Sequence, residues 1–463
     1  MNLRSSYFIS LVASAMILTL SMGCSGVKNC VPPALNLPEE LAGNSIDSTT
    51  IADLAWWEIY TDSALVAIIN ETLVNNRDLL AAGAKVEQMR ELYGLSKANF
   101  FPTVGGNVYG NYETNDYKDE KKVRDPEYGL KATISWETDL WGGLKWARRK
   151  GDADFMASIE NRRAMMMTLI AETASTYFQL IALDNELSIV RQTLATREEN
   201  VRMAKLRFEG GLTPETVYQQ AQVEYATTAA LVPNLERQIE MAKSALTLLM
   251  GRYPEKELAR GRLSLERAIP DYLPVGLPST LLQRRPDLRM SEQQLRSALA
   301  GVGVAYANRF PNFRIALTGG WENNSLKGFF SSPFSYTIGQ ITGTILDFGR
   351  NKRKYRAAIA AYDQARYAYE QDVLEAFKEV SDAVETFQRR RQTTSLRRDL
   401  REAAGKYVEL ANLQYRSGIL AYIDVLDAQR RFFEAQIGLS NAVRDEYLAL
   451  VNLYKVLGGG WNQ

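Results

Sequence analysis

The sequence predicts a mixed α/β membrane protein in which a β-barrel, shared between copies of the chain, continues into a cylinder of long α-helices. Three observations predict this architecture. The chain is an internal duplication, each half contains two amphipathic strands, and each half contains helices too long for a globular domain. No apolar run after residue 23 approaches the 18 or more residues of a spanning helix, so any span of the mature chain must be a closed barrel.

The N-terminus is typical of a secretory signal. Arg4 precedes an apolar run over residues 7–20, which is too short to span a membrane, and Ser-Met-Gly-Cys follows at 21–24. A cysteine directly after such a segment resembles the lipobox of bacterial lipoproteins, although Ser21 stands where leucine is usual. We therefore expect residues 1–23 to be removed and Cys24 to carry lipid. The alternative is an ordinary signal peptide with a chance cysteine.

The rest of the chain contains two copies of one plan, offset by 207 to 209 positions. Five landmarks recur in the same order, with the same Pro and Gly punctuation, which chance similarity between helices would not reproduce. The landmark pairs begin at residues 78 and 287, 98 and 307, 139 and 347, 208 and 415, and 248 and 455. They predict an N-terminal segment (24–54), a first repeat (55–251), a Pro-rich connector (252–281) and a second repeat (282–460).

Each repeat contains two segments in which apolar and polar residues alternate. Between Tyr128 and Trp136 every second residue is apolar, and the length suits a tilted membrane strand of about 9–11 residues. A soluble antiparallel sheet is the alternative. The expected strands are about 103–113, 128–139, 312–322 and 334–346, the last with a bulge near Gln340, where its alternation changes phase.

Very long helices follow each strand pair. Residues 152–209 contain no Pro or Gly over 58 positions, and residues 351–416 contain only Gly405 over 66 positions. In both helices apolar residues recur at alternating spacings of three and four positions, which indicates supercoiled packing against other helices. Four strands cannot close a barrel, because about eight are needed to span a membrane. Two copies of the chain would supply eight strands and three would supply twelve.

The composition argues against an enzyme. There is no histidine, so the commonest general base and the usual neutral metal ligand are missing, and we expect no catalytic or metal site and no cofactor beyond the lipid. Lys plus Arg (55) nearly equals Asp plus Glu (54), which gives no reason to expect nucleic acid as a partner.

These landmarks resemble the TolC/OprM family of outer-membrane efflux proteins, more closely its lipoprotein branch. The most specific match is residues 273–288, supported by 56–65 and 75–79. The resemblance implies a homotrimer with a 12-stranded outer-membrane barrel and a periplasmic helical tunnel. It implies the exit duct of a tripartite export system, with a periplasmic adaptor and an inner-membrane pump as partners. A lipid-anchored helical scaffold or adhesion protein of the cell envelope is the alternative function. Drug, metal and protein cargoes stay open.

The resemblance also implies a gate at the periplasmic end. Tyr415, Gly418, Asp424 and Asp427 match in spacing the residues that narrow the mouth of TolC-like proteins. The two aspartates, three positions apart, project from one helix face. We expect them to form an electronegative constriction with Tyr415 packed beside it. Two ordinary surface aspartates are the alternative.

Two positions depart from the family pattern. Leu420 stands where TolC itself has an arginine in its gate lock. Val217, in the first repeat, stands at the position where the family pattern has the aspartate partner. The bonds that close the gate must therefore differ. We expect closure to depend on apolar packing at Leu420.

Overall fold

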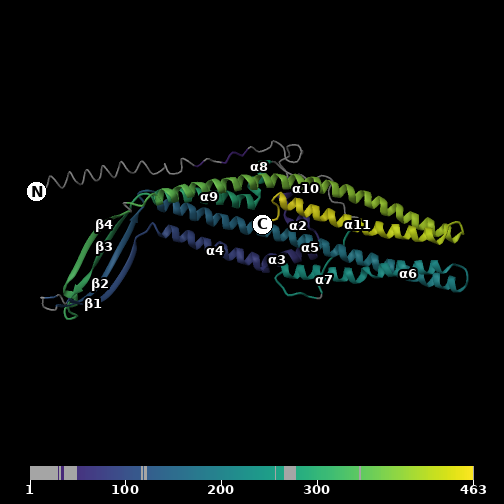
Figure 1. The fold of residues 1–463 in the computed structure, drawn as a ribbon, viewed down its shortest axis with the longest axis horizontal. Coiled ribbons are helices and arrows are strands. Elements are labelled where there is room, and N and C mark those ends of the chain that lie inside the picture. Colours follow the sequence, from purple (N-terminus) through teal and green to yellow (C-terminus); the bar gives the residue numbers. More distant parts are fainter. Residues whose placement is uncertain are drawn as a thin grey trace. The chain divides into compact units, whose positions relative to one another are not determined.

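The structure is a computed structural model that describes residues 30, 33–35, 50–115, 118, 123–255, 257–264, 278–343 and 346–461 (Figure 1). The signal segment and Cys24 lie outside these residues. The chain divides into two compact units. The described part of unit 1 lies mainly in Lys85–Ile159 and Met290–Gln371, and that of unit 2 in Asn36–Ala84, Glu160–Arg289 and Asp372–Gln463. Of the helices described, none is both long and apolar enough to cross a membrane.

The two repeats have the same order of elements. After a 3₁₀ turn (η3, Ile51–Asp53) and one helical turn (α2, Trp56–Ile59), repeat 1 contains α3 (Ser63–Asn75), α4 (Arg77–Ala98), β1 (Thr103–Asn115), β2 (Val123–Thr138), α5 (Gly143–Glu209), α6 (Glu215–Ala229) and α7 (Leu231–Leu249). Repeat 2 contains α8 (Pro278–Arg284), α9 (Pro286–Ala307), β3 (Asn312–Asn323), a 3₁₀ turn (η4, Phe329–Ser331), β4 (Pro333–Thr342), α10 (Arg350–Arg416) and α11 (Tyr422–Val456). Helices α5 and α10 both have 67 residues, so the duplication extends to the length of the longest helix.

The return helices differ between the repeats. Helix α11 is continuous over 35 residues, whereas the corresponding stretch of repeat 1 is split at Ala230 into α6 and α7. Pro233 is the third residue of α7. Proline lacks the N–H that an interior helical position needs and is tolerated in a first turn, so it favours a new helix start here.

The recurring landmarks that begin at Asp139 (Asp-Leu-Trp-Gly) and Asp347 (Asp-Phe-Gly) mark the starts of helices. Asp139 accepts hydrogen bonds from the backbone N–H groups of Leu144 (2.8 Å) and Lys145 (2.9 Å) at the start of α5. Asp347 does the same for Gly349 (2.9 Å) and Asn351 (3.0 Å) before α10, and these bonds lower the pKa of its carboxyl group. The aspartates therefore satisfy N–H groups that a helix start leaves without partners.

The strands of unit 1 form one antiparallel sheet in the order β1-β2-β3-β4 (Figure 1). Val104, Ile134 and Leu317 are cross-strand partners, and all three are exposed large apolar side chains on one face. Thr133 and Thr318 lie on the opposite face, where their hydroxyl groups are 3.0 Å apart. In the described residues, β1 and β4 each have one edge with no strand beside it.

The bulge expected near Gln340 is wrong, and β4 ends at Thr342 rather than near 346. Its register with β3 is unbroken from Trp321↔Pro333 to Asn312↔Thr342, so each residue faces one partner. The apolar residues of β4 move from one face of the sheet to the other, while the backbone register with β3 stays the same. Tyr336 lies opposite Thr318 and Ile338 opposite Ala316, which puts these two apolar side chains on the polar face of the sheet.

In unit 2 the connector is fixed to α5. The Tyr177 side chain is fully buried, and its hydroxyl donates to Asp62 Oδ2 (2.7 Å) while it accepts from the Gly261 N–H (2.8 Å). Arg260, next to Gly261, forms an ion pair with Asp184 of α5. One buried tyrosine thus joins the start of α3, the middle of α5 and the connector.

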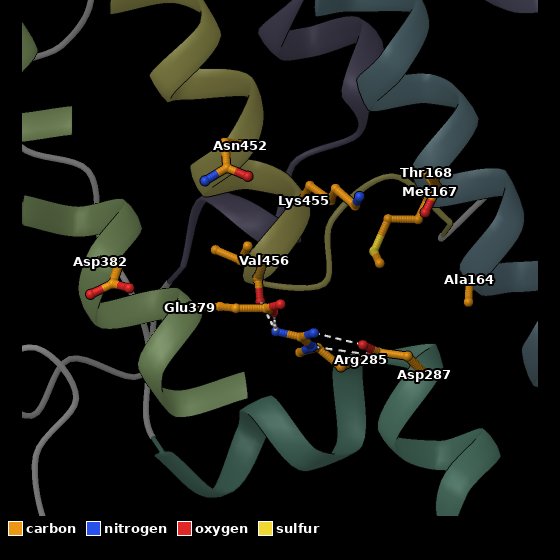
Figure 2. A pocket seen from close by; sticks show the side chains of 10 residues that line it. All are labelled: Ala164, Met167, Thr168, Arg285, Asp287, Glu379, Asp382, Asn452, Lys455 and Val456. Atoms are coloured by element: carbon orange, nitrogen blue, oxygen red, sulfur yellow. Dashed lines mark hydrogen bonds and ion pairs between the residues drawn. The ribbon is translucent and has the colours of Figure 1, made fainter. Parts of the chain in front are cut away.

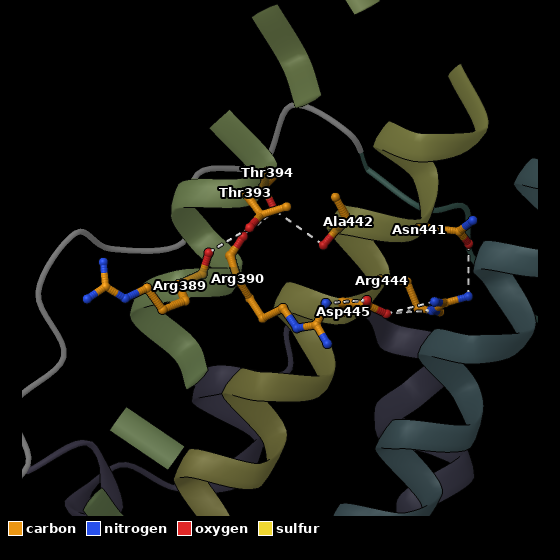
Figure 3. A network of polar contacts seen from close by, with 8 residues as sticks. All are labelled: Arg389, Arg390, Thr393, Thr394, Asn441, Ala442, Arg444 and Asp445. Carbon is orange, nitrogen blue, oxygen red and sulfur yellow. Dashed lines mark hydrogen bonds and ion pairs between the residues drawn. The ribbon is translucent and has the colours of Figure 1, made fainter. Parts of the chain in front are cut away.

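Helices α10 and α11 are joined by polar contacts (Figure 3). Arg390 of α10 forms a 2.9 Å ion pair with Asp445 of α11, and Asp445 also binds the neighbouring Arg444 at 2.7 Å. The buried Thr394 hydroxyl donates to the Ala442 carbonyl oxygen (3.2 Å). These contacts join the middle of α10 to α11.

A buried arginine joins three helices of unit 2 (Figure 2). The side chain of Arg285, between α8 and α9, is 8% exposed and forms ion pairs with Asp287 (2.6 Å) and with Glu379 of α10 (2.7 Å). It also lies 3.4 Å from the carbonyl oxygen of Val456, the last residue of α11. A cavity of about 390 Å³ borders this cluster.

Candidate functional site

The predicted site lies where each long helix ends and the chain turns back. Gly211 and Gly418 follow α5 and α10 with φ of 70° and 75°, a conformation that glycine adopts without strain. Backbone bonds from Leu212 to Arg207 (2.8 Å) and from Ile419 to Gln414 (2.9 Å) close both helix ends. We call α5 with α6 the first hairpin and α10 with α11 the second hairpin.

Tyr415 links the two hairpins. Arg207, in the last turn of α5, donates a hydrogen bond from Nη1 to the Tyr415 hydroxyl, and its guanidinium carbon lies 5.3 Å from the centre of the Tyr415 ring. The ring also lies 5.5 Å from that of Tyr422, in the first turn of α11. The hydrogen-bond partner of Tyr415 is thus an arginine of repeat 1, not Asp424 or Asp427.

Leu420 packs on a small apolar cluster at the tip of the second hairpin. The cluster consists of Ala411, Val425 and Ala428, each at most 2% exposed, with Val408, Tyr415 and Leu420 packed against it. Leu420, which stands where TolC itself has an arginine, therefore contributes apolar contacts in this chain.

The two aspartates occupy successive turns of α11 and have different partners. Asp424 is half-buried and accepts a hydrogen bond from the backbone N–H of Ala421 (3.2 Å), so it caps the helix start. Asp427 forms ion pairs with Arg430 (2.6 Å) and Arg431 (2.7 Å). Arg431 and Arg430 hold the pKa of Asp427 below its usual range. Among the residues that the structure describes, the charge of Asp427 is thus offset by ion pairs and that of Asp424 is not.

Sequence reasoning missed three arginines of this site. Arg430 and Arg431 stand three and four positions after Asp427, a spacing that predicts ion pairs on a helix. That signal was present in the sequence. Arg207 is 208 positions from Tyr415, and no local pattern indicates their contact. Another cross-repeat bond lies nearby, from Asn200 of α5 to Gln429 of α11 (2.9 Å).

Known proteins resemble the chain over most of its length. The model of the outer membrane efflux protein family matches it twice, over residues 68–252 and 277–459. The solvent efflux pump outer membrane protein SrpC of Pseudomonas putida is 31% identical over 88% of the chain and 87% of its own length. The probable outer membrane lipoprotein SilC of Salmonella typhimurium is 30% identical over 94% of the chain and 91% of its own length.

A solved structure agrees with these relatives. The outer-membrane channel OprN superposes with a TM-score of 0.85 and 28% identity, over 93% of this chain and 99% of its own. The match includes both repeats, and each repeat of this chain contains a strand pair, one 67-residue helix and a glycine-closed helix end. The chain therefore belongs to the outer membrane efflux protein family.

Proposed function

We propose that three copies of the chain form a channel that crosses the outer membrane as a 12-stranded barrel and continues as a helical tunnel into the periplasm. The protein acts in the outer membrane as an efflux channel. The observation that supports the trimer is the four-stranded sheet, with unpaired edges at β1 and β4 and exposed apolar side chains on one face. Lipid leaves such edges unsatisfied, so β4 of one copy pairs with β1 of the next.

In this proposal the channel is the exit duct of a tripartite system, and the chain itself performs no chemistry. Cargo arrives from an inner-membrane pump through a periplasmic adaptor. The names of the relatives support a role in efflux: one is part of a solvent efflux pump, and another is the cation efflux system protein CusC of Escherichia coli, 29% identical over 95% of the chain. Family membership leaves the scaffold or adhesion alternative without support.

The proposed gate is the tip of the second hairpin. Asp424 and Asp427 would face the three-fold axis, so that three copies place six carboxylates there, two from each. Their field attracts cations and is screened by salt. Arg430 and Arg431 offset Asp427, so Asp424 supplies most of this field. The Arg207–Tyr415 contact holds the two hairpins together in the closed state, in place of the aspartate that Val217 replaces.

The gate is tested by replacing both aspartates with asparagine. In planar bilayers, Asp424→Asn with Asp427→Asn is expected to lower cation selectivity and block by multivalent cations from the periplasmic side, because it removes the negative charge. The amide that replaces the Asp424 carboxylate keeps an oxygen for the Ala421 N–H, so the trimer should stay intact. Asp399→Asn, at an exposed carboxylate of α10, is the control. Unchanged selectivity and block in the double mutant would falsify the assignment.

We also propose that Cys24 is the acylated first residue of the mature protein. The supporting observation is its position directly after a short apolar segment and Gly23. Intact-mass measurement of the purified protein is expected to show lipid on residue 24. Because the barrel anchors the protein, Cys24→Ala exported through a replacement signal should still form trimers. A mature chain that begins elsewhere and has a free thiol at Cys24 would contradict the proposal.

A further inference from the structure

A cavity of about 260 Å³ lies between the tips of the two hairpins. Both repeats line it, and none of its lining residues is Asp or Glu. Its charged groups are the guanidinium groups of Arg207 and Arg416, and Asn200, Asn412 and Gln429 add side-chain amides. A concave site with convergent polar groups and a positive charge is suited to an anion.

Two buried hydroxyl groups in this cavity have no partner. Thr213 Oγ1 and Tyr422 Oη are inaccessible to solvent, and neither forms a hydrogen bond within the described residues. Burial and, less strongly, Tyr415 raise the pKa of Tyr422 to about 12, so its hydroxyl is a proton donor at neutral pH. A buried polar group left unsatisfied costs about 1–3 kcal/mol. Both residues line the cavity, one from each repeat, and a ligand that accepts hydrogen bonds would satisfy their hydroxyl groups.

The two arginines of the cavity differ in whether their guanidinium groups already have a partner in the protein. Arg207 binds Tyr415, whereas Arg416 is exposed and makes no ion pair with any residue that the structure describes. Neither nearby aspartate is paired with Arg416: Asp424 accepts the Ala421 N–H at the start of α11, and Asp427 is held by Arg430 and Arg431. Arg416 is therefore available for an outside anion, and a guanidinium group matches the two oxygens of a carboxylate or phosphate.

The volume limits the size of the ligand. Sites for drug-sized molecules measure roughly 300–1,000 Å³, and this cavity is smaller. We propose that it binds a small oxyanion, a phosphate or carboxylate group, between Arg207 and Arg416, with Thr213 and Tyr422 donating to the anion. Such an anion would join the first hairpin to the second and hold the gate closed. The binding is independent of the channel, but the effect on opening rests on the proposed function.

Binding is tested on the purified full-length protein in detergent by isothermal titration calorimetry with inorganic phosphate and, separately, acetate, at matched ionic strength. We expect at least one of the two to bind. Arg416→Gln is expected to weaken binding about ten- to a hundredfold, because it removes a charged hydrogen bond. Tyr422→Phe should weaken binding less and leave the protein as stable as before, since the hydroxyl that it removes has no partner.

Arg202→Gln is the matched control. Arg202 is also on α5 but is exposed, pairs with Glu199 and does not line the cavity, so binding should not change. No heat with either anion, or equal affinity in the wild type and Arg416→Gln, would overturn the proposal.

Single-channel recording separates this inference from the proposed function. The anion that binds is expected to lower the open probability of the wild-type channel and to have a smaller effect on Arg416→Gln. A channel that conducts and loses cation selectivity on Asp424→Asn with Asp427→Asn, yet is unaffected by either anion, would reject the anion's effect on opening alone. A protein that forms no channel would reject the proposed function, while calorimetry would still decide on binding.

Discussion

Replacing Arg285 by methionine is expected to lower the free energy of unfolding of the helical part by about 1.5–3 kcal/mol, because it removes hydrogen bonds to charged groups. Asp287 and Glu379 both lose their cation, and because their side chains are 37% and 48% exposed, water partly compensates the two carboxylates that remain. The change also separates α10 from the junction of α8 and α9 and removes the group beside the end of α11. Thermal unfolding followed by circular dichroism should show a lower midpoint for the variant.

The control for this prediction is Arg296→Met. Arg296 is also on α9 and pairs with Glu292 at 2.6 Å, but its side chain is 60% exposed. Exposed ion pairs contribute about 0–1 kcal/mol, so the control should unfold close to the wild type. Equal midpoints for the two variants would show that the Arg285 cluster does not hold the three helices together.

The same cluster predicts a dependence on pH. Burial by itself would raise the pKa of Asp287, but hydrogen bonds and the charge of Arg285 outweigh it, and the pKa lies below its ordinary value in the folded protein. A carboxyl group with a lowered folded pKa contributes stability above its unfolded pKa of about 3.9 and loses that contribution as pH falls through the folded pKa. Arg285→Met should therefore cost less stability at strongly acidic pH than at neutral pH.

The fold could be predicted from the sequence wherever a local pattern determines the backbone. Asp139 and Asp347 stand in recurring landmarks because each caps a 67-residue helix, and Gly211 and Gly418 recur because both helix ends require a positive φ. Strand β4 shows the limit. Its apolar residues change phase in the sequence, and only the register with β3 tells whether the backbone or the choice of face has changed.

The site could be predicted only in part, for the same reason. Asp424 and Asp427 stand out by spacing, but what each charge does depends on partners. Arg430 and Arg431 are three and four residues away, so the offset of Asp427 follows from the sequence. Arg207 and Tyr415 belong to different repeats and meet only because the hairpins pack side by side. Val217 shows in the sequence that the aspartate partner is missing, but nothing in the sequence shows that Arg207 contacts Tyr415 instead.

The proposed barrel predicts a large effect at Ile134. This side chain is 43% exposed in the single chain, and its cross-strand partners Val104 and Leu317 are 74% and 47% exposed. Such a set on one face of a sheet is explained if lipid covers it. Ile134→Arg is expected to cost about 2–4 kcal/mol if the residue lies near the midplane of the membrane, because lipid solvates a guanidinium group poorly.

Thr133→Arg is the comparison, one residue away on the other face of β2. It removes the Thr133–Thr318 hydrogen bond, worth about 1 kcal/mol, but places its charge toward the interior of the proposed barrel, where water is available. In native mass spectrometry of detergent-extracted protein, the wild type should be a trimer. Trimers of Ile134→Arg should dissociate at a lower temperature than those of Thr133→Arg. If the order is reversed, the apolar face is not the lipid face, and a wild type that is stable as a monomer or dimer would reject the shared barrel itself.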